Sequence, residues 1–236
     1  MKALAATVVL ACSFTAAASA DVTTVTFDNG WEGWHGTGAT LVGARGNPGA
    51  HAHTQIINFG VEYWTDSHAA FLGDYTQYSS VTISVDVKVN EINFFGTPVP
   101  RNLILDLRNL DLAQDGYLYS SVWFNLSEVE GGMDWATYSV TFDPNSPVMP
   151  AGWGGTGAED PDTFMPMLPA HLTFADVMAN IGQVSISTYE PGFFYSLNTY
   201  FDLQVDNIRI ETTPIPAPGA GLALLGLAAV GRRRRR

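Results

Sequence analysis

Four tryptophans stand where an aromatic ring could stack on a sugar. A pyranose ring has an apolar face, and an exposed indole offers a flat apolar partner to it. The candidates, each in a segment expected to form a loop, are Trp34, Trp64, Trp135 and Trp153. The competing interpretation is that these rings fill the core, because tryptophan is highly buried on average in folded proteins.

Two carboxylates, those of Asp28 and Asp206, lie near the two ends of the predicted domain and could share a cation. Phe27-Asp28-Asn29-Gly30 resembles the opening of carbohydrate-binding jelly rolls, and Asp206-Asn207-Ile208 resembles their closing strand. In such modules the first and last strands often bring one acidic side chain each to a structural calcium. Carboxylate oxygens suit this hard cation. The alternative is that Asp28-Asn29-Gly30 is a turn and that Asp206 caps a bulge.

His51 and His53 are two residues apart and would share one face of an extended segment. Two imidazoles on one face could bind zinc. A third ligand would have to come from another strand, from His35 or His68. Otherwise the pair consists of ordinary polar residues at a sheet edge.

The sequence offers little for catalysis. It contains no Gly-x-Ser-x-Gly elbow, no His-Glu-x-x-His pair and no phosphate-binding loop. Acidic pairs such as Glu128 with Glu130 fall in predicted loops and are most simply solvated charge. A sandwich-fold glycosidase or lyase would need two carboxylates that face each other across a concave sheet. We therefore expect no enzyme.

Charge limits the partners further. The segment 21–213 has five basic residues against 23 acidic ones, a net charge of −18, since the other basic residues lie at the chain ends. Such a surface repels phosphate backbones and excludes nucleic acid as a partner. Cys12 is the only cysteine, so stability does not depend on disulfides.

Apolar residues alternate with polar ones through most of this segment. In the strand 79–89 the odd positions from Val81 onward are apolar and the even positions polar, and Leu103, Leu105 and Leu107 repeat the pattern. This period of two indicates antiparallel strands with one buried face. Tyr117–Leu126, with large residues on both faces, is expected to be a central strand. We predict an all-β, antiparallel, jelly-roll-like β-sandwich of the galactose-binding-like type.

Two local features break the alternation. Phe174, Val177, Met178 and Ile181 form an apolar stripe behind a Thr173/Asp176 capping box, which predicts one short helix near 174–181. In the last strand the apolar positions change from odd to even between Val205 and Ile208, which predicts a β-bulge at Asp206-Asn207.

One stretch resembles a known family. Tyr63-Trp64, then Phe71-Leu72-Gly73-Asp74, then the strand 79–89 are similar to the laminin IV type A (laminin B) domain, and the order of later elements agrees over 27–211. The cysteine-rich repeats among which laminin domains sit are missing here. The resemblance implies a noncatalytic extracellular sandwich and names no ligand.

The ends of the chain predict export. Residues 1–20 have the charged, apolar and small-residue regions of a signal peptide. Residues 214–236 contain a proline spacer, an apolar stretch expected to be a transmembrane helix, and five arginines, and they resemble a PEP-CTERM sorting signal in which Ala217 replaces the usual glutamate. The arginines favour a cytoplasmic end, so the tail would hold the chain in the membrane before processing. The predicted sandwich domain is 21–213.

Two hypotheses for function follow. The first is a noncatalytic module at the cell surface, in the outer envelope or in extracellular matrix, that acts in adhesion or structure with a surface or matrix protein as its partner. The alternative is a carbohydrate-binding module that holds an extracellular polysaccharide. A concave face with exposed aromatic rings would favour the second hypothesis, and a filled polar face would favour the first.

Overall fold

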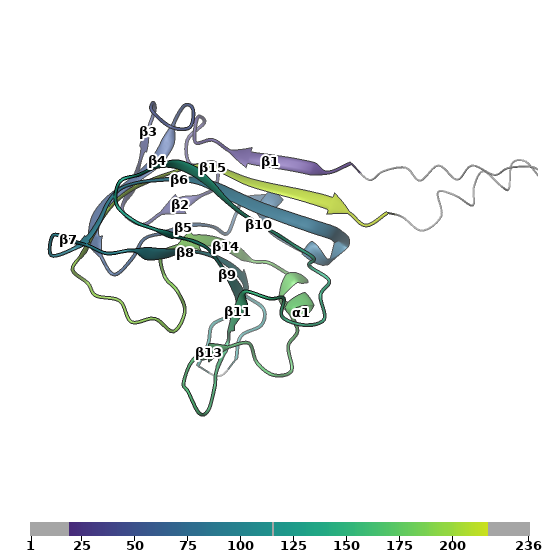
Figure 1. The fold of residues 1–236 in the computed structure, drawn as a ribbon. Coiled ribbons are helices and arrows are strands. Elements are labelled where there is room, and N and C mark those ends of the chain that lie inside the picture. The colour runs from purple at the N-terminus through teal and green to yellow at the C-terminus, as the bar shows by residue number, and fades with distance from the viewer. Residues whose placement is uncertain (1–18, 115, 217–236) are drawn as a thin grey trace, which may run out of the picture.

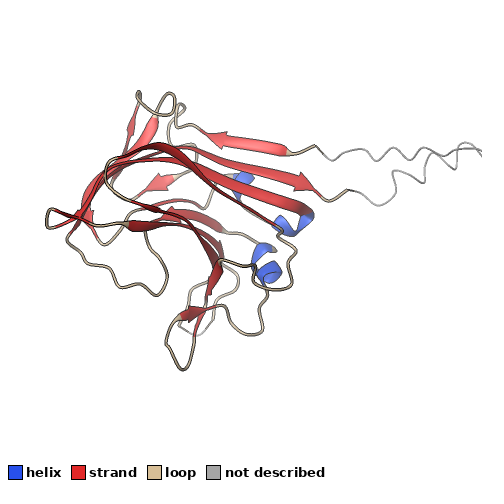
Figure 2. Ribbon diagram, viewed as in Figure 1, coloured by secondary structure: helices blue, strands red, loops and turns tan. Residues whose placement is uncertain are grey.

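The computed structural model describes residues 19–114 and 116–216. Two antiparallel β-sheets lie face to face in two layers (Figures 1 and 2). The predicted antiparallel β-sandwich is confirmed. The predicted signal peptide at 1–20 and the tail at 214–236 lie almost wholly outside the described residues. Within these residues, no helix has the length and apolar character needed to cross a membrane.

The upper layer of Figure 1 is a seven-stranded sheet. Its main path runs in the order β10-β6-β15-β4-β3, while β1 pairs with β15 and β7 pairs with β6. The strands are β1 (Asp21–Val25), β3 (Ala39–Val42), β4 (His51–Asn58), β6 (Tyr78–Phe94), β7 (Thr97–Pro98), β10 (Met133–Phe142) and β15 (Thr199–Pro214).

The lower layer is a six-stranded sheet in the order β11-β9-β8-β14-β5-β2. Its strands are β2 (His35–Gly36), β5 (Glu62–Thr65), β8 (Arg101–Asn109), β9 (Ser120–Val129), β11 (Trp153–Thr156) and β14 (Gln183–Ser187). A small two-stranded sheet of β12 (Ala158–Glu159) and β13 (Pro166–Met167) lies below this layer (Figure 1). Two 3₁₀ turns, η1 (Ala69–Phe71) and η2 (Tyr75–Gln77), precede β6.

The core lies between the layers and follows from the alternation. The odd-numbered residues of 81–89 in β6 are buried, as are Leu103, Leu105 and Leu107 in β8. Because successive side chains of a strand point to opposite faces, the residues between them are directed to the outer faces of the sandwich. The outer side chains are therefore the candidates for binding.

The predicted helix is present but shorter than expected. α1 spans Phe174–Met178, and both bonds of the Thr173/Asp176 capping box form. Ile181 lies outside the helix because its backbone exchanges two hydrogen bonds with Gly73. The prediction that the apolar stripe is buried was correct. Its last residue, Ile181, reaches the core from the β-bridge with Gly73 and not from the helix.

The predicted bulge in β15 is confirmed. The pairing with β6 shifts register between Asp206 and Arg209, and Asn207 has a φ of 47°. On its other edge, β15 pairs with β4 as far as Val205 and with β1 from Ile208 onward. The bulge keeps both Val205 and Ile208 in the core while the strand changes partners.

One expected strand is displaced. The structure has Tyr117–Tyr119 in a loop, and β9 begins at Ser120. β9 lies between β8 and the edge strand β11, so it is an interior strand as expected, although it is next to the edge of the sheet. Large residues occur on both faces because Val122 enters the core while Trp123 lies on the outer face.

We predict that Leu105→Ala lowers the free energy of unfolding by about 2–5 kcal/mol, because it leaves a cavity in the core. Leu105 is 0% exposed, whereas Leu118 in the loop before β9 is 87% exposed. Leu118→Ala is therefore the matched control and should change stability by less than about 0.5 kcal/mol. Urea unfolding followed by tryptophan fluorescence measures both, and equal losses would contradict this assignment of the core.

Candidate functional site

Two of the four candidate tryptophans belong to the core. Trp34 is 0% exposed and packs edge-on against Phe71, so the expectation that it meets a ligand is wrong. Trp153 on β11 is partly buried among Phe124, Phe142 and Phe174. Both rings are held by aromatic neighbours on the inner side of the sandwich.

The other two tryptophans are partly exposed but lie on opposite sheets. Trp64 on β5 stacks on the ring of His35, with centroids 5.4 Å apart. Trp135 on β10 packs edge-on against His51 of the seven-stranded sheet. They cannot contribute to one binding surface, because the core separates them.

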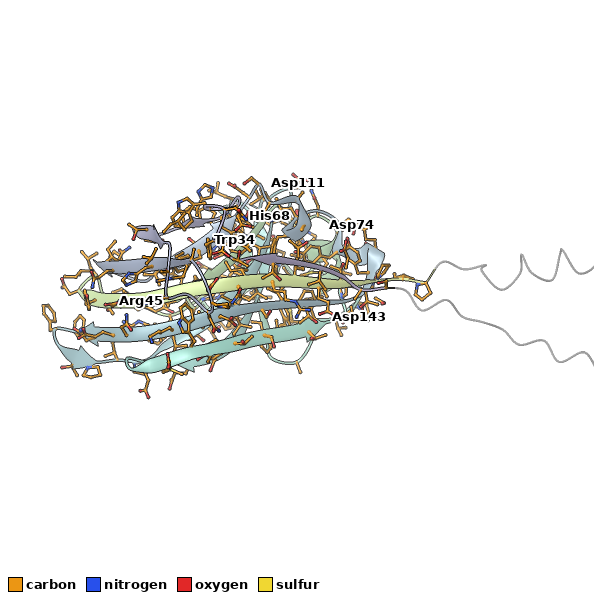
Figure 3. The ribbon with its side chains drawn as sticks, turned by 90° about the horizontal axis from the view of Figure 1, so that it is seen from above. Trp34, Arg45, His68, Asp74, Asp111 and Asp143 are labelled. Atoms are coloured by element: carbon orange, nitrogen blue, oxygen red, sulfur yellow. The ribbon has the colours of Figure 1, made fainter. Side chains whose placement is uncertain are left out.

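Asp28 and Asp206 lie in one network with the loop between β3 and β4. The loop passes over the outer face of the seven-stranded sheet, where Arg45 marks it in Figure 3. Asp28 Oδ1 accepts the backbone N–H of Ala50 at 2.9 Å, and Asp206 Oδ2 accepts that of Asn47 at 2.5 Å. The structure therefore brings the two predicted ligands to one place through the loop.

A third carboxylate completes this network. Asp86 lies opposite Asp206 in the pairing of β6 with β15 and accepts hydrogen bonds from the side-chain amides of Asn47 and Asn207. Asp206 is 0% exposed. Burial raises the pKa of Asp206 to about 6, and the charges of Asp86 and Asp28 add to the rise although two backbone N–H groups oppose it.

The surroundings of Asp206 are rich in oxygen. A Cβ added to Gly46 would collide with the carbonyl oxygens of Ala50 and Gly49 and with Asp206 Oδ2. Carbonyl and carboxylate oxygens are the donors that calcium takes. However, among the described residues no group of three or more His, Cys, Asp or Glu side chains is placed to hold a metal ion. Calcium at Asp28 and Asp206 stays a prediction.

The histidines do not form the alternative zinc site in the part of the chain that the structure describes. His53 Nε2 contacts Asp202 Oδ1 at 2.8 Å, and its ring is 6.1 Å from that of His51. His35 stacks on Trp64, and His68 caps η1. Each imidazole thus has a separate structural contact.

The outer face of the six-stranded sheet contains a cleft that the sequence analysis did not anticipate. Its volume is about 420 Å³, within the usual range for small-molecule sites. Asp106, Arg108 and Thr156 lie at its floor, on β8 and β11. The loop before β9 and the loop after β14 form its walls. Their lining residues are Gly116, Tyr117, Leu118 and Tyr119 on one side and Tyr189, Glu190, Pro191, Phe193 and Tyr195 on the other.

Arg108 organises the floor of this cleft. Its Nε donates to Asp106 Oδ2 at 2.6 Å, and its other nitrogens contact Glu62 Oε1 at 2.8 Å and the side-chain oxygen of Gln183. The guanidinium lies over the Tyr119 ring, 5.1 Å from the centroid. Since these partners come from β5, β8 and β14 and from the loop, one cation fixes several elements.

The electrostatics of the floor are those of a buried ion pair. Burial alone would lower the pKa of Arg108, but Asp106 and Glu62 outweigh it and raise this pKa. Burial also raises the pKa of Asp106, against the influence of Arg108. Asp106 is 6% exposed, and among the described residues no side chain or backbone group forms a hydrogen bond with its Oδ1. That oxygen is itself buried, so the floor of the cleft is a carboxylate held by Arg108 and is not an open acceptor.

Sequence reasoning had a signal for this pair. In β8 the odd leucines indicated the buried face, and the intervening positions carry Asp106 and Arg108, opposite charges two residues apart on the other face. Only five basic residues occur in 21–213, so an arginine within a strand was informative. The wall residues had no comparable signal, since their position depends on the course of two loops.

No family model matches the chain, and no curated protein matches it. Among solved structures it is similar to PfGH50B, at 13% identity and a TM-score of 0.42 over 81% of this chain, but it spans only 23% of that chain. A structure described as "CBM4 structure and function" is 16% identical, with a TM-score of 0.33 over 76% of this chain and 86% of that one.

A third similar structure is the carbohydrate esterase vb_24B_21 from the Shiga toxin-encoding bacteriophage phi24B. It is 13% identical with a TM-score of 0.38, over 81% of this chain and 100% of that one. At this level of similarity the likeness is to the fold and does not extend to a ligand or an activity. The laminin B resemblance stays a prediction.

We predict that Asp206 makes the fold less stable as the pH rises. Its pKa of about 6 in the folded state is above the ordinary value, so the folded state holds the proton more tightly. This contribution is fully present below about pH 4 and is lost between about pH 4 and pH 6. Urea unfolding measures the free energy of unfolding at pH 4 and at pH 7. This free energy should fall less between the two pH values in Asp206→Asn than in the unsubstituted chain. Equal losses in the two proteins would rule out this role.

We also predict that calcium raises the thermal midpoint of the chain, since a ligand that binds only the folded state stabilises it. The shift between calcium and EDTA should disappear in Asp206→Ala. Asp202→Ala is the matched control, because Asp202 lies on the same strand but contacts His53, Asn90 and Gln55. If the midpoint is the same with calcium and with EDTA, the network is held by hydrogen bonds alone.

Proposed function

We propose that this protein is a noncatalytic carbohydrate-binding protein and that the cleft on the outer face of its six-stranded sheet takes the sugar. The observation that carries the proposal is the combination of a buried Asp106–Arg108 pair at the floor with tyrosine rings in both walls. Hydrogen-bonding groups fix the orientation of a ligand, and aromatic groups supply the contact area. A sugar, with hydroxyls at its edge and apolar faces, needs both.

The walls make this proposal specific. Tyr119 and Tyr189 belong to different loops, and both are partly buried with the pKa raised by burial. Tyr195 is positioned by its hydroxyl, which accepts the backbone N–H of Glu190, and by Arg101, 5.6 Å from its ring centroid. Rings that are already held lose little conformational freedom when a ligand binds.

The cleft also bears on the two hypotheses from the sequence. A filled polar face would have favoured an adhesive or structural module, whereas this face is open between two loops and has aromatic walls. We therefore favour carbohydrate binding. With the predicted signal peptide and sorting tail, the protein would be exported and would hold an extracellular polysaccharide at the cell surface.

One observation favours a second candidate function. Asp106 and Glu190 both line the cleft, and a pair of carboxylates across a sugar could hydrolyse a glycosidic bond. Asp106 is bound to Arg108, and Glu190 Oε2 accepts a hydrogen bond from Asn102 at 2.7 Å. Both carboxylates thus have orienting partners, which suits binding as well as catalysis.

We predict that the full chain binds at least one glycan of a neutral and acidic panel and that Asp106→Asn weakens this binding about tenfold, because it removes the ion pair with Arg108 that holds the floor of the cleft. Affinity electrophoresis finds the glycan, and calorimetry then measures the dissociation constant. Asp134→Asn is the matched control, because Asp134 pairs with Lys88 on the opposite sheet.

Two results would argue against the proposal. Failure of every glycan in the panel to bind would remove the carbohydrate-binding function and leave adhesion to a protein partner. New reducing ends after incubation with the glycan, lost in Asp106→Asn, would replace binding with hydrolysis.

A further inference from the structure

A row of outward side chains crosses the whole six-stranded sheet through Asp106. The strand registers pair Trp123 with Gly154 of β11 on one side and with Asp106 of β8 on the other. The row continues through Ser185 of β14 to Trp64 of β5 and to His35 of β2. Two tryptophans therefore flank a polar centre on the same face.

Trp123 forms a platform at one end of this row. A Cβ added to Gly154 would collide with three atoms of its indole, Cε2, Cζ2 and Nε1. Because a Cβ at Gly154 would point out of the sheet, the indole must lie over the bare backbone of β11. The glycine allows the ring to pack on the sheet, where its Nε1 is buried while Trp123 as a whole stays partly exposed.

Trp64 is placed differently at the other end. It stacks on His35, with an interplanar angle of 29°, and His35 lies on the edge strand β2. One face of Trp64 is therefore turned toward the edge of the sheet, and its other face is turned toward Ser185 and the centre of the row. Trp64 and His35 together make a wall.

The centre of the row is polar and carries a surplus of negative charge. One cation, Arg108, serves two carboxylates, Asp106 and Glu62. The hydroxyl of Ser185 donates to Glu62 Oε1 at 2.7 Å, so it orients the same group. A carboxylated or sulfated sugar would have to approach this cluster against repulsion, whereas an uncharged sugar would not.

The distance between the two rings sets the size of the ligand. Trp123 and Trp64 are three strands apart, roughly 14 Å, because neighbouring strands lie about 4.8 Å apart. A single sugar ring in the cleft could not contact both. The row also ends at an edge strand on each side, β11 and β2, so a long chain could continue past either end.

We propose that the ligand is an uncharged, linear polysaccharide that crosses the six-stranded sheet from β11 to β2, lying on Trp123, passing through the cleft above Asp106 and then passing the wall of Trp64. This inference rests on the carbohydrate binding proposed above and adds the direction, length and charge of the ligand. Arg108 acts as a positioning residue that holds Asp106 and Glu62.

Calorimetry of the full chain with neutral gluco-, xylo- and manno-oligosaccharides, from disaccharide to hexasaccharide, tests this proposal, with uronate oligosaccharides as the charged comparison. Affinity should rise with length until the chain reaches both tryptophans. Trp64→Ala and Trp123→Ala should each lower the affinity for the longest oligosaccharide roughly tenfold. Trp64→Ala should also remove most of the increase in affinity with length.

Gly154→Ala supplies a sharper variant, since it keeps the indole but displaces it. Gly154→Ala should lose as much affinity for the longest oligosaccharide as Trp123→Ala does. Trp135→Ala removes a comparable ring from the opposite sheet and should bind as the unsubstituted chain does. Thermal midpoints and circular dichroism of each variant separate a lost contact from a lost fold.

The outcomes distinguish this inference from the proposed function. Binding that does not depend on length, normal binding by Trp64→Ala, or preference for uronate chains would overturn the inference and leave carbohydrate binding in place. If no saccharide binds at all, both this inference and the proposed carbohydrate-binding function are contradicted.

Discussion

The outer face of the six-stranded sheet depends on the contacts of one buried cation, Arg108. Its side chain is 16% exposed, and it holds carboxylates from β8 and β5 while Tyr119 covers its plane. Removing one partner of a buried ion pair typically costs about 3–5 kcal/mol, because the other charge stays buried without compensation. The pair is outside the core only because Leu105 and Leu107 are inside it. A slip of one residue in β8 would turn Asp106 and Arg108 inward.

Side chains of the seven-stranded sheet also alternate between the core and the outer face, but here a loop of the protein covers part of the outer face. Its outward residues Ser84, Asp86 and Asp206 are buried too, and the β3–β4 loop supplies amide donors to both carboxylates. The bulge at Asp206 aims this carboxylate at the loop while β15 passes from β4 to β1. The protein's own chain thus occupies this part of the face, whereas the loops on the six-stranded sheet stand apart and leave a cleft. This asymmetry decides which face is available to a ligand.

Local patterns predicted what local forces determine. The strands of 79–89 and 103–107, the capping box at Thr173 and the bulge at Asp206-Asn207 depend on neighbours in the sequence, and all four are confirmed. The exposure of a tryptophan depends on the element that packs over it, and here the sequence was a poor guide. Trp34 is covered, whereas Trp123 lies over a glycine from a strand about thirty residues away. The cleft walls depend on two loops whose course no periodicity encodes.

The arrangement around Asp106 bears on the choice that we propose between binding and turnover. A glycosidase needs one carboxyl group that can pass a proton to the leaving oxygen and a second that can reach the sugar or a water. Asp106 Oδ2 is engaged by Arg108, which favours the charged form, but burial outweighs this contact and raises the pKa of Asp106. Glu62 is held by Arg108 and by the hydroxyl of Ser185. Carboxylates held in this manner keep a fixed geometry, so the cation that creates the polar floor also gives it the rigidity that the proposed recognition of a sugar requires.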